Sequence, residues 1–177
     1  ETAINRRGSV TMIVRNNTSE DIGSINVTGT ARDAAGTLVG SGSSQGFEPA
    51  YVAPGEIAYG YVYFDTELAG QTFAFGFEVD AEPVAGAIAS RLPVTVTEIS
   101  NTGDQLVGVA TNELDKDVTG PIGAAVLCFD AGGSVTDYTD GYLEQNDLAP
   151  GATGSFSIDL FGKPCPNGIV SASGYGF

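Results

Sequence analysis

Three tyrosines, Tyr59, Tyr61 and Tyr63, stand at every second position of one short segment, and their type and spacing suit a contact site. Side chains two positions apart lie on the same face of an extended strand, so the rings should form one outward stripe. A phenol ring has apolar faces and a hydroxyl rim, which suits stacking on a sugar or contact with a protein. The stripe is the ligand-binding candidate of this sequence. Packing of the same rings against a neighbouring domain is the alternative.

The chain contains no histidine, which removes the commonest general base and the commonest metal ligand. Serine-histidine and cysteine-histidine hydrolase chemistry is therefore excluded. Acidic side chains are numerous, but groups such as Glu113, Asp115 and Asp117 match no calcium-binding loop, and Lys116 lies inside that group. We interpret them as solvated loop charges. We expect no bound metal, no cofactor, no catalytic residues and no enzymatic activity.

Two cysteines, Cys128 and Cys165, both lie in the second half of the chain. Cys128 stands in a strand-like apolar run, and Cys165 stands in a loop between two prolines. A covalent tie from strand to loop is common in exported β domains, so we favour a disulfide between them over two free thiols.

The overall composition limits the class of protein and the class of partner. The chain has 177 residues, of which 42% are hydrophobic, so it can form one or two packed domains. Its net charge of −15 repels nucleic-acid phosphates, and we expect no nucleic-acid partner. No run of 18 apolar residues occurs, so we expect no transmembrane segment.

The sequence repeats itself at an offset of about 96 residues. Ala53-Pro54-Gly55 matches Ala149-Pro150-Gly151 at this offset, and Asn16 matches Asn112 before a polar loop. An Asp-x-x-Gly turn also recurs, at an offset of 97. The repeat predicts two homologous domains at 1–81 and 92–177, joined by a linker at 82–91.

Within each copy the apolar residues recur with a period of two, which is typical of half-buried strands. The clearest runs are Ile25, Val27, Gly29 and Ala31, and Phe73, Phe75, Phe77 and Val79. Short strands separated by Gly and Pro turns predict an all-β protein of two tandem immunoglobulin-like antiparallel sandwiches. The second copy begins with a full strand at 92–99, whose counterpart in the first copy would fall near or before Glu1. We therefore expect a shortened first strand in the first domain, with an exposed edge that invites pairing with another chain.

The order of turns and strands resembles the FxLYD domain of bacteria and archaea. The second copy carries the resemblance best, in 125–135 followed by 147–151, and the first copy retains Val52-Ala53-Pro54-Gly55. The resemblance implies an accessory β-sandwich module, commonly found in exported or lipid-anchored proteins, with no catalytic residues to carry over.

These observations together predict a binding or adhesion module or a structural spacer, with a protein or a polysaccharide at the cell surface as its partner. The alternative is a carbohydrate-binding accessory module of an enzyme system. We expect an extracellular or cell-envelope location, reached by secretion or through an N-terminal lipoprotein signal that has been removed.

Overall fold

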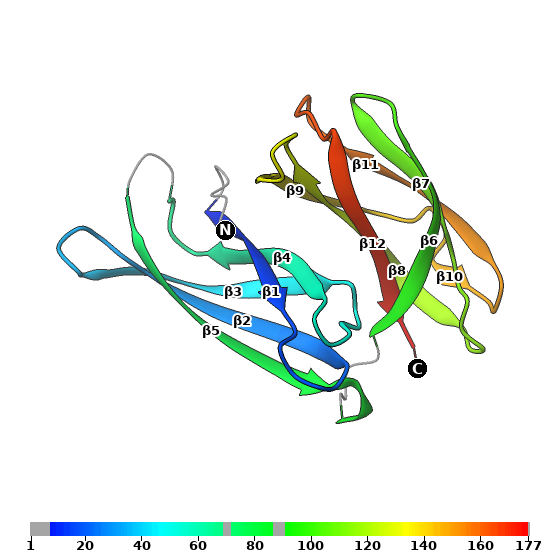
Figure 1. Cartoon of the computed structure of the whole chain (residues 1–177), viewed down its shortest axis with the longest axis horizontal. Helices are drawn as coiled ribbons and strands as arrows, with labels where there is room; N and C mark the ends of the chain where they lie inside the picture. Colours follow the sequence, from blue (N-terminus) through cyan, green and yellow to red (C-terminus); the bar gives the residue numbers. More distant parts are fainter. Residues whose placement is uncertain (1–7, 69–71, 87–90, 177) are drawn as a thin grey trace. The chain divides into compact units, whose positions relative to one another are not determined.

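The computed structural model describes residues 8–68, 72–86 and 91–176. It is an all-β protein with two antiparallel sheets that curl into sandwich-like domains, which confirms the predicted fold class (Figure 1). Unit 1 comprises the described parts of 1–47 and 52–87. Unit 2 comprises 48–51 and the described parts of 88–177. No helix in the described part of the chain is long and apolar enough to cross a membrane.

Unit 1 contains one five-stranded sheet in the order β1-β4-β3-β2-β5. Alternate residues of these strands face a core in which Val10, Val27, Val62 and Phe64 are fully buried, so the period-two pattern accounts for the packing. The elements are β1 (Ser9–Arg15), β2 (Ile22–Arg32), β3 (Leu38–Glu48), β4 (Ile57–Phe64), β5 (Ala74–Pro83) and the short 3-10 turn η1 (Val84–Gly86).

Unit 2 contains a seven-stranded sheet in the order β10-β8-β12-β6-β7-β11, with β9 paired to β8. The strand β6 joins two parts of this sheet: Arg91–Val94 pair with β12, and Thr95–Asn101 pair with β7. The strands are β6 (Arg91–Asn101), β7 (Gln105–Thr111), β8 (Val118–Phe129), β9 (Val135–Tyr142), β10 (Asp147–Leu148), β11 (Thr153–Asp159) and β12 (Asn167–Tyr175).

A buried asparagine organises the same loop in both units. The side-chain amide of Asn16 donates to the carbonyls of Glu20 and Val52, and Asn112 donates in the same way to Lys116 and Leu148, all at 2.8 Å. Both asparagines are at most 1% exposed. The acceptor residues in unit 2 follow those in unit 1 by the repeat offset, so the sequence repeat corresponds to a repeated hydrogen-bond pattern.

A tight turn also recurs, at Asp33 and at Asp130. Each aspartate accepts backbone N–H groups two and four residues further on, at distances of 2.8 to 2.9 Å. Gly36 and Gly133 follow three residues after the aspartates with φ angles of 82° and 83°, a conformation that glycine adopts without steric cost. The two turns give corresponding hairpins, β2–β3 and β8–β9, in the two units.

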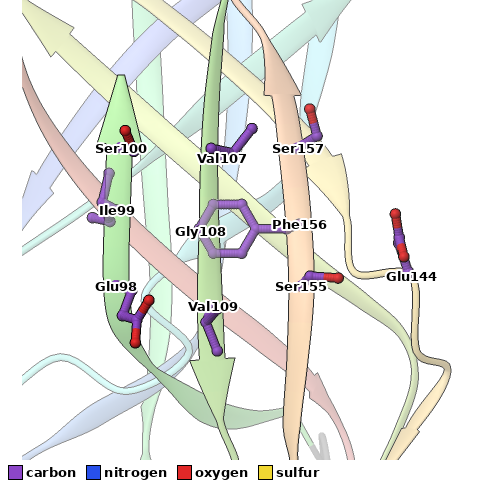
Figure 2. A pocket seen from close by; sticks show the side chains of 10 residues that line it. All are labelled: Glu98, Ile99, Ser100, Val107, Gly108, Val109, Glu144, Ser155, Phe156 and Ser157. Carbon is purple, nitrogen blue, oxygen red and sulfur yellow. The ribbon is translucent and has the colours of Figure 1, made fainter. Parts of the chain in front are cut away.

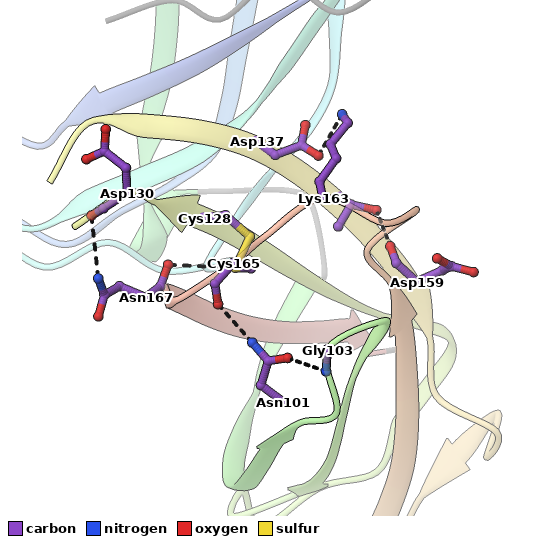
Figure 3. Close-up of a disulfide and its surroundings, with 10 residues drawn as sticks. Asn101, Gly103, Cys128, Asp130, Asp137, Asp159, Lys163, Cys165 and Asn167 are labelled. Atoms are coloured by element: carbon purple, nitrogen blue, oxygen red, sulfur yellow. Dashed lines mark hydrogen bonds and ion pairs between the residues drawn. A yellow bond between two sulfur atoms is a disulfide. The ribbon is translucent and has the colours of Figure 1, made fainter. Parts of the chain in front are cut away.

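The predicted disulfide between Cys128 and Cys165 is present, and both residues belong to the core of unit 2. Figure 3 shows how the loop that carries Cys165 is also held by polar contacts. Asn101 donates to the carbonyl of Cys165 at 2.8 Å, and Lys163 forms an ion pair with Asp137 at 2.8 Å. The bridge ties β8 to the segment between β11 and β12.

Substitution of either buried asparagine should destabilise its own unit. Asn112→Ala removes three hydrogen bonds, two donated to the carbonyls of Lys116 and Leu148 and one accepted from the N–H of Leu114, and we expect the free energy of unfolding to fall by about 3 kcal/mol. Asn16→Ala should have a similar effect on unit 1. Asn26→Ala is the matched control, because its exposed amide donates only to the nearby carbonyl of Ser24, and it should change stability by less than about 0.5 kcal/mol. Urea unfolding of the three variants tests this, and equal stabilities would contradict it.

Loss of the disulfide should destabilise unit 2. The bridge closes a segment with a sequence separation of 37, and chain entropy alone gives about 4 kcal/mol for a loop of this length. Unfolding should therefore occur at a lower urea concentration in the double variant Cys128→Ala, Cys165→Ala. Lys163→Ala, which removes only an exposed ion pair beside the bridge, should cost less than about 1 kcal/mol. A mass that does not rise by about 2 Da on reduction would show that the thiols are not paired.

Candidate functional site

The three tyrosines share one face of β4, but they are not equally accessible. Tyr63 is 50% exposed, Tyr61 is partly buried and Tyr59 is completely buried. The predicted outward stripe of three rings is therefore wrong for Tyr59, which cannot touch an external ligand. The period of the strand fixes which side chains share a face, but it does not fix what covers that face. Ser9 and Thr11, which pair with Tyr63 and Tyr61, are also buried.

A shallow groove of about 410 Å³ lies on unit 2, across β6, β7 and β11 (Figure 2). We call it the β6–β7–β11 groove. It is lined by Glu98, Ile99, Ser100, Val107, Gly108, Val109, Glu144, Ser155, Phe156 and Ser157.

Strand register arranges the polar and apolar side chains of the groove in two parallel rows. Directly paired residues stand on the same face of a sheet, so Glu98, Val109 and Ser155 form one row. Ser100, Val107 and Ser157 form the second row. Each row therefore carries one half-buried valine between two exposed polar side chains.

Gly108 lies between Val107 and Val109 along β7, so its side-chain position faces the opposite side of the strand, towards the core. It pairs with Ile99 on one side and with Phe156 on the other. A Cβ atom at this position would lie 2.4 Å from the ring of Phe156, so glycine is required there by close packing. Phe156 is 3% exposed and belongs to the core, so the ring supports the groove.

Carboxylates stand at the margins of this groove. Glu98 and Glu144 are both exposed, and Figure 2 shows Glu144 outside β11 and Glu98 on β6. The backbone N–H of Glu144 donates to the carbonyl of Ser155 at 2.9 Å, which fixes its segment beside the groove. The groove therefore offers three accessible apolar side chains, those of Ile99, Val107 and Val109, together with three serine hydroxyls and two glutamate carboxylates.

A buried polar cluster in unit 2 consists of Glu48, Arg91 and Ser173. The Ser173 hydroxyl donates to Glu48 Oε1 at 2.6 Å, and Arg91 forms an ion pair with the same oxygen. Glu48 Oε2 has no hydrogen-bond partner among the described residues. Burial raises the pKa of Glu48, and the charge of Arg91 opposes this shift.

This cluster is unsuited to reaction with a substrate. The Ser173 side chain is a nucleophile only if a substrate can reach it, and the residue is 1% exposed. Glu48 is 5% exposed. The arrangement therefore holds 48–51 within unit 2, and the sequence contains no local signal for it because Ser173 is 125 positions away.

The acidic groups singled out in the sequence do not converge. In the described part of the chain, no group of three or more His, Cys, Asp or Glu side chains could hold a metal ion. Glu113 instead accepts a hydrogen bond from the Thr95 hydroxyl at 2.7 Å, and Asp137 forms its ion pair beside the disulfide.

No protein-family model matches this sequence, and no curated protein matches it. The resemblance to the FxLYD domain therefore stays a prediction that rests on the turn and strand order of the chain.

Stability should depend on pH through Glu48. A pKa that is raised in the folded state means that folding favours the protonated carboxyl, so this contribution to stability is present below the unfolded pKa, near 4.5, and is lost as the pH rises through the folded pKa. The unfolding free energy of the native protein minus that of Glu48→Gln should therefore fall as the pH rises from about 4.5 through the folded pKa of Glu48. Asp140→Asn tests the same mechanism and should show the same trend, because burial also raises the pKa of Asp140 and the Asp140 charge contributes to the raised pKa of Glu48. A difference that grows with pH would show that attraction to Arg91 outweighs burial.

Proposed function

We propose that this protein is a non-catalytic binding module of the cell surface or the extracellular space, with the β6–β7–β11 groove as its contact surface. The observation that carries the proposal is that two half-buried valines lie between exposed serine and glutamate side chains on one face of the sheet. Removal of the valines from water favours association, and the serines and glutamates on either side can exchange hydrogen bonds with a partner instead of water.

The shape of the groove favours a macromolecular partner over a small molecule. Pockets for small ligands are concave enough to bury most of the ligand surface. The β6–β7–β11 groove instead lies across the open face of three strands, where a ridge or an extended segment of another protein fits. Glu98 and Glu144 favour a partner with positive charge beside its apolar contact.

The disulfide supports the proposed location. Cross-links of this kind form and persist in oxidising compartments and are rare in the cytosol. Cys128 and Cys165 are both nearly inaccessible, which protects the bridge from reductants and fits a structural role outside the cell.

A carbohydrate-binding accessory module is the second candidate, and the exposure of Tyr63 favours it. This ring is 50% exposed on β4 of unit 1, and the partly buried Tyr61 shares its face. A sugar stacked on Tyr63 would place the site on unit 1. The two candidates therefore differ in the unit and in the side chains that make contact.

Substitutions in the groove should weaken binding without unfolding the protein. Val107→Thr together with Val109→Thr keeps the shape and strand preference of both side chains but makes them polar. Each substitution removes about 1 kcal/mol of favourable binding free energy that comes from burial of apolar surface, so affinity should fall roughly tenfold or more. The measurement is the affinity of a peptide selected by the intact protein from a displayed random library, repeated on the double variant.

Two control variants assign the site. Ile169→Thr changes an exposed apolar residue of β12 outside the groove and should leave peptide affinity unchanged. Tyr63→Ala should also leave it unchanged, whereas loss of binding on a glycan array in Tyr63→Ala alone would favour the carbohydrate module. No binding to peptides or glycans by the folded protein would contradict both candidates and favour a spacer.

A further inference from the structure

Unit 2 contains the strand β6, which has no counterpart among the described strands of unit 1, and unit 2 shows what this strand does. There β6 lies between β12 and β7, and it pairs with both. Ala172 of β12 faces Val94 of β6 in register and is 2% exposed. A strand at this position therefore covers the edge of β12 from Ala172 to Tyr175 and contributes to the burial of Ala172.

Unit 1 has counterparts of both neighbours of β6. The pair Val14 and Ala58 of β1 and β4 corresponds, at the repeat offset, to Ala110 and Gly154 of β7 and β11. Likewise β5 pairs with β2 as β12 pairs with β8. Yet among the described residues β1 and β5 are the two edges of the sheet, and each has a strand on one side only (Figure 1).

The free edge of β5 exposes apolar surface. Val79 pairs with the buried Val27, as Ala172 pairs with Ala124, so Val79 and Ala172 hold equivalent places. Val79 is 48% exposed, whereas Ala172 is 2% exposed. Two further residues of the same face, Phe75 and Phe77, pack on the core but stay partly exposed, with their rings stacked at 5.9 Å.

The opposite face of β5 carries three exposed carboxylates, on Glu78, Asp80 and Glu82. No described cation forms an ion pair with them, and their cross-strand partners on β2 are uncharged. Like charges placed opposite one another destabilise a strand pair, so these carboxylates disfavour pairing with β5 of a second copy. The net charge of −15 also disfavours association of two copies of the chain. A strand with cations at alternate positions is complementary to this edge.

We propose that the free edge of β5 binds an extended segment of a partner protein, in which apolar residues alternate with lysine or arginine. The segment adds to the sheet antiparallel to β5, as β6 does to β12. Main-chain hydrogen bonds to β5 hold it, its apolar side chains cover Val79 and the two phenylalanines, and its cations face the carboxylates. This contact lies on unit 1 and is independent of the groove proposed above.

A synthetic peptide tests the proposal on the full chain. The probe has the sequence of 91–97 with Pro93→Lys, Thr95→Lys and Thr97→Lys, which keeps the apolar residues of β6 and supplies the cations. We expect saturable binding by fluorescence anisotropy, weaker at high ionic strength, and slower amide hydrogen exchange at Gly76–Asp80 when the peptide is bound. A control peptide with glutamate in place of each cation should not bind.

Variants of the chain locate the contact. Val79→Lys replaces an exposed side chain and should weaken binding about tenfold or more, through lost apolar contact and repulsion of the peptide. Ile169→Lys, an equally exposed position on β12, is the matched control and should bind as the native chain does. Glu78→Gln together with Asp80→Asn should reduce the dependence of binding on ionic strength.

Four results would overturn the proposal. One is absence of saturable binding by the folded chain, and another is equal binding of the acidic peptide. A third is slow hydrogen exchange in the free monomer at the β5 amides that point away from β2, which would show that the chain itself covers this edge. The last is a dimer in light scattering that Val79→Lys dissociates, which would make a second copy the occupant.

Discussion

The buried side-chain amide of Asn16 or Asn112 is the interaction on which the architecture of each unit depends. A loop that leaves a sheet and returns carries backbone carbonyls into the interior, where an unpaired polar group is costly. One amide donates to such a buried carbonyl 36 residues further along the chain and to a second, partly buried carbonyl of the loop itself. It thereby fixes how the strand before the loop meets the Ala-Pro-Gly turn. Because the same asparagine hydrogen bonds form in both units, the strand and loop arrangement that the units share depends on buried hydrogen bonds as much as on apolar packing.

The sequence predicts features that depend on neighbours along the chain. Alternation within a strand and turn residues are local features, and the repeat is found by comparing the chain with itself. These features were sufficient to predict the all-β class and the equivalent asparagine loops. The pairing of Cys128 with Cys165 followed because the chain holds only two cysteines. The common face of Tyr59, Tyr61 and Tyr63 was also predictable. The burial of Tyr59 was not, because it depends on what lies over the face and not on the strand itself.

Long-range contacts account for the features that the sequence did not predict. The β6–β7–β11 groove requires the register of three strands, which places Gly108 between Ile99 and Phe156. No single strand contains that information. The same holds for Glu48, whose partner Arg91 lies 43 positions away and which reads in sequence as an ordinary surface glutamate. Its membership of unit 2, although the preceding Phe47 belongs to unit 1, follows from tertiary structure alone.

The differences between the two copies bear on function more directly than the frame that they share. Turns, buried asparagines and core positions recur, so they explain stability and not specificity. Unit 2 has the disulfide and the strand β6, which is paired on both edges, and the β6–β7–β11 groove lies on this unit. Among the described strands of unit 1, β5 is instead a sheet edge with apolar side chains on one face and carboxylates on the other. A sheet edge of this kind is an aggregation hazard unless its charges select what pairs with it, and in our proposal the carboxylates of β5 provide that selection.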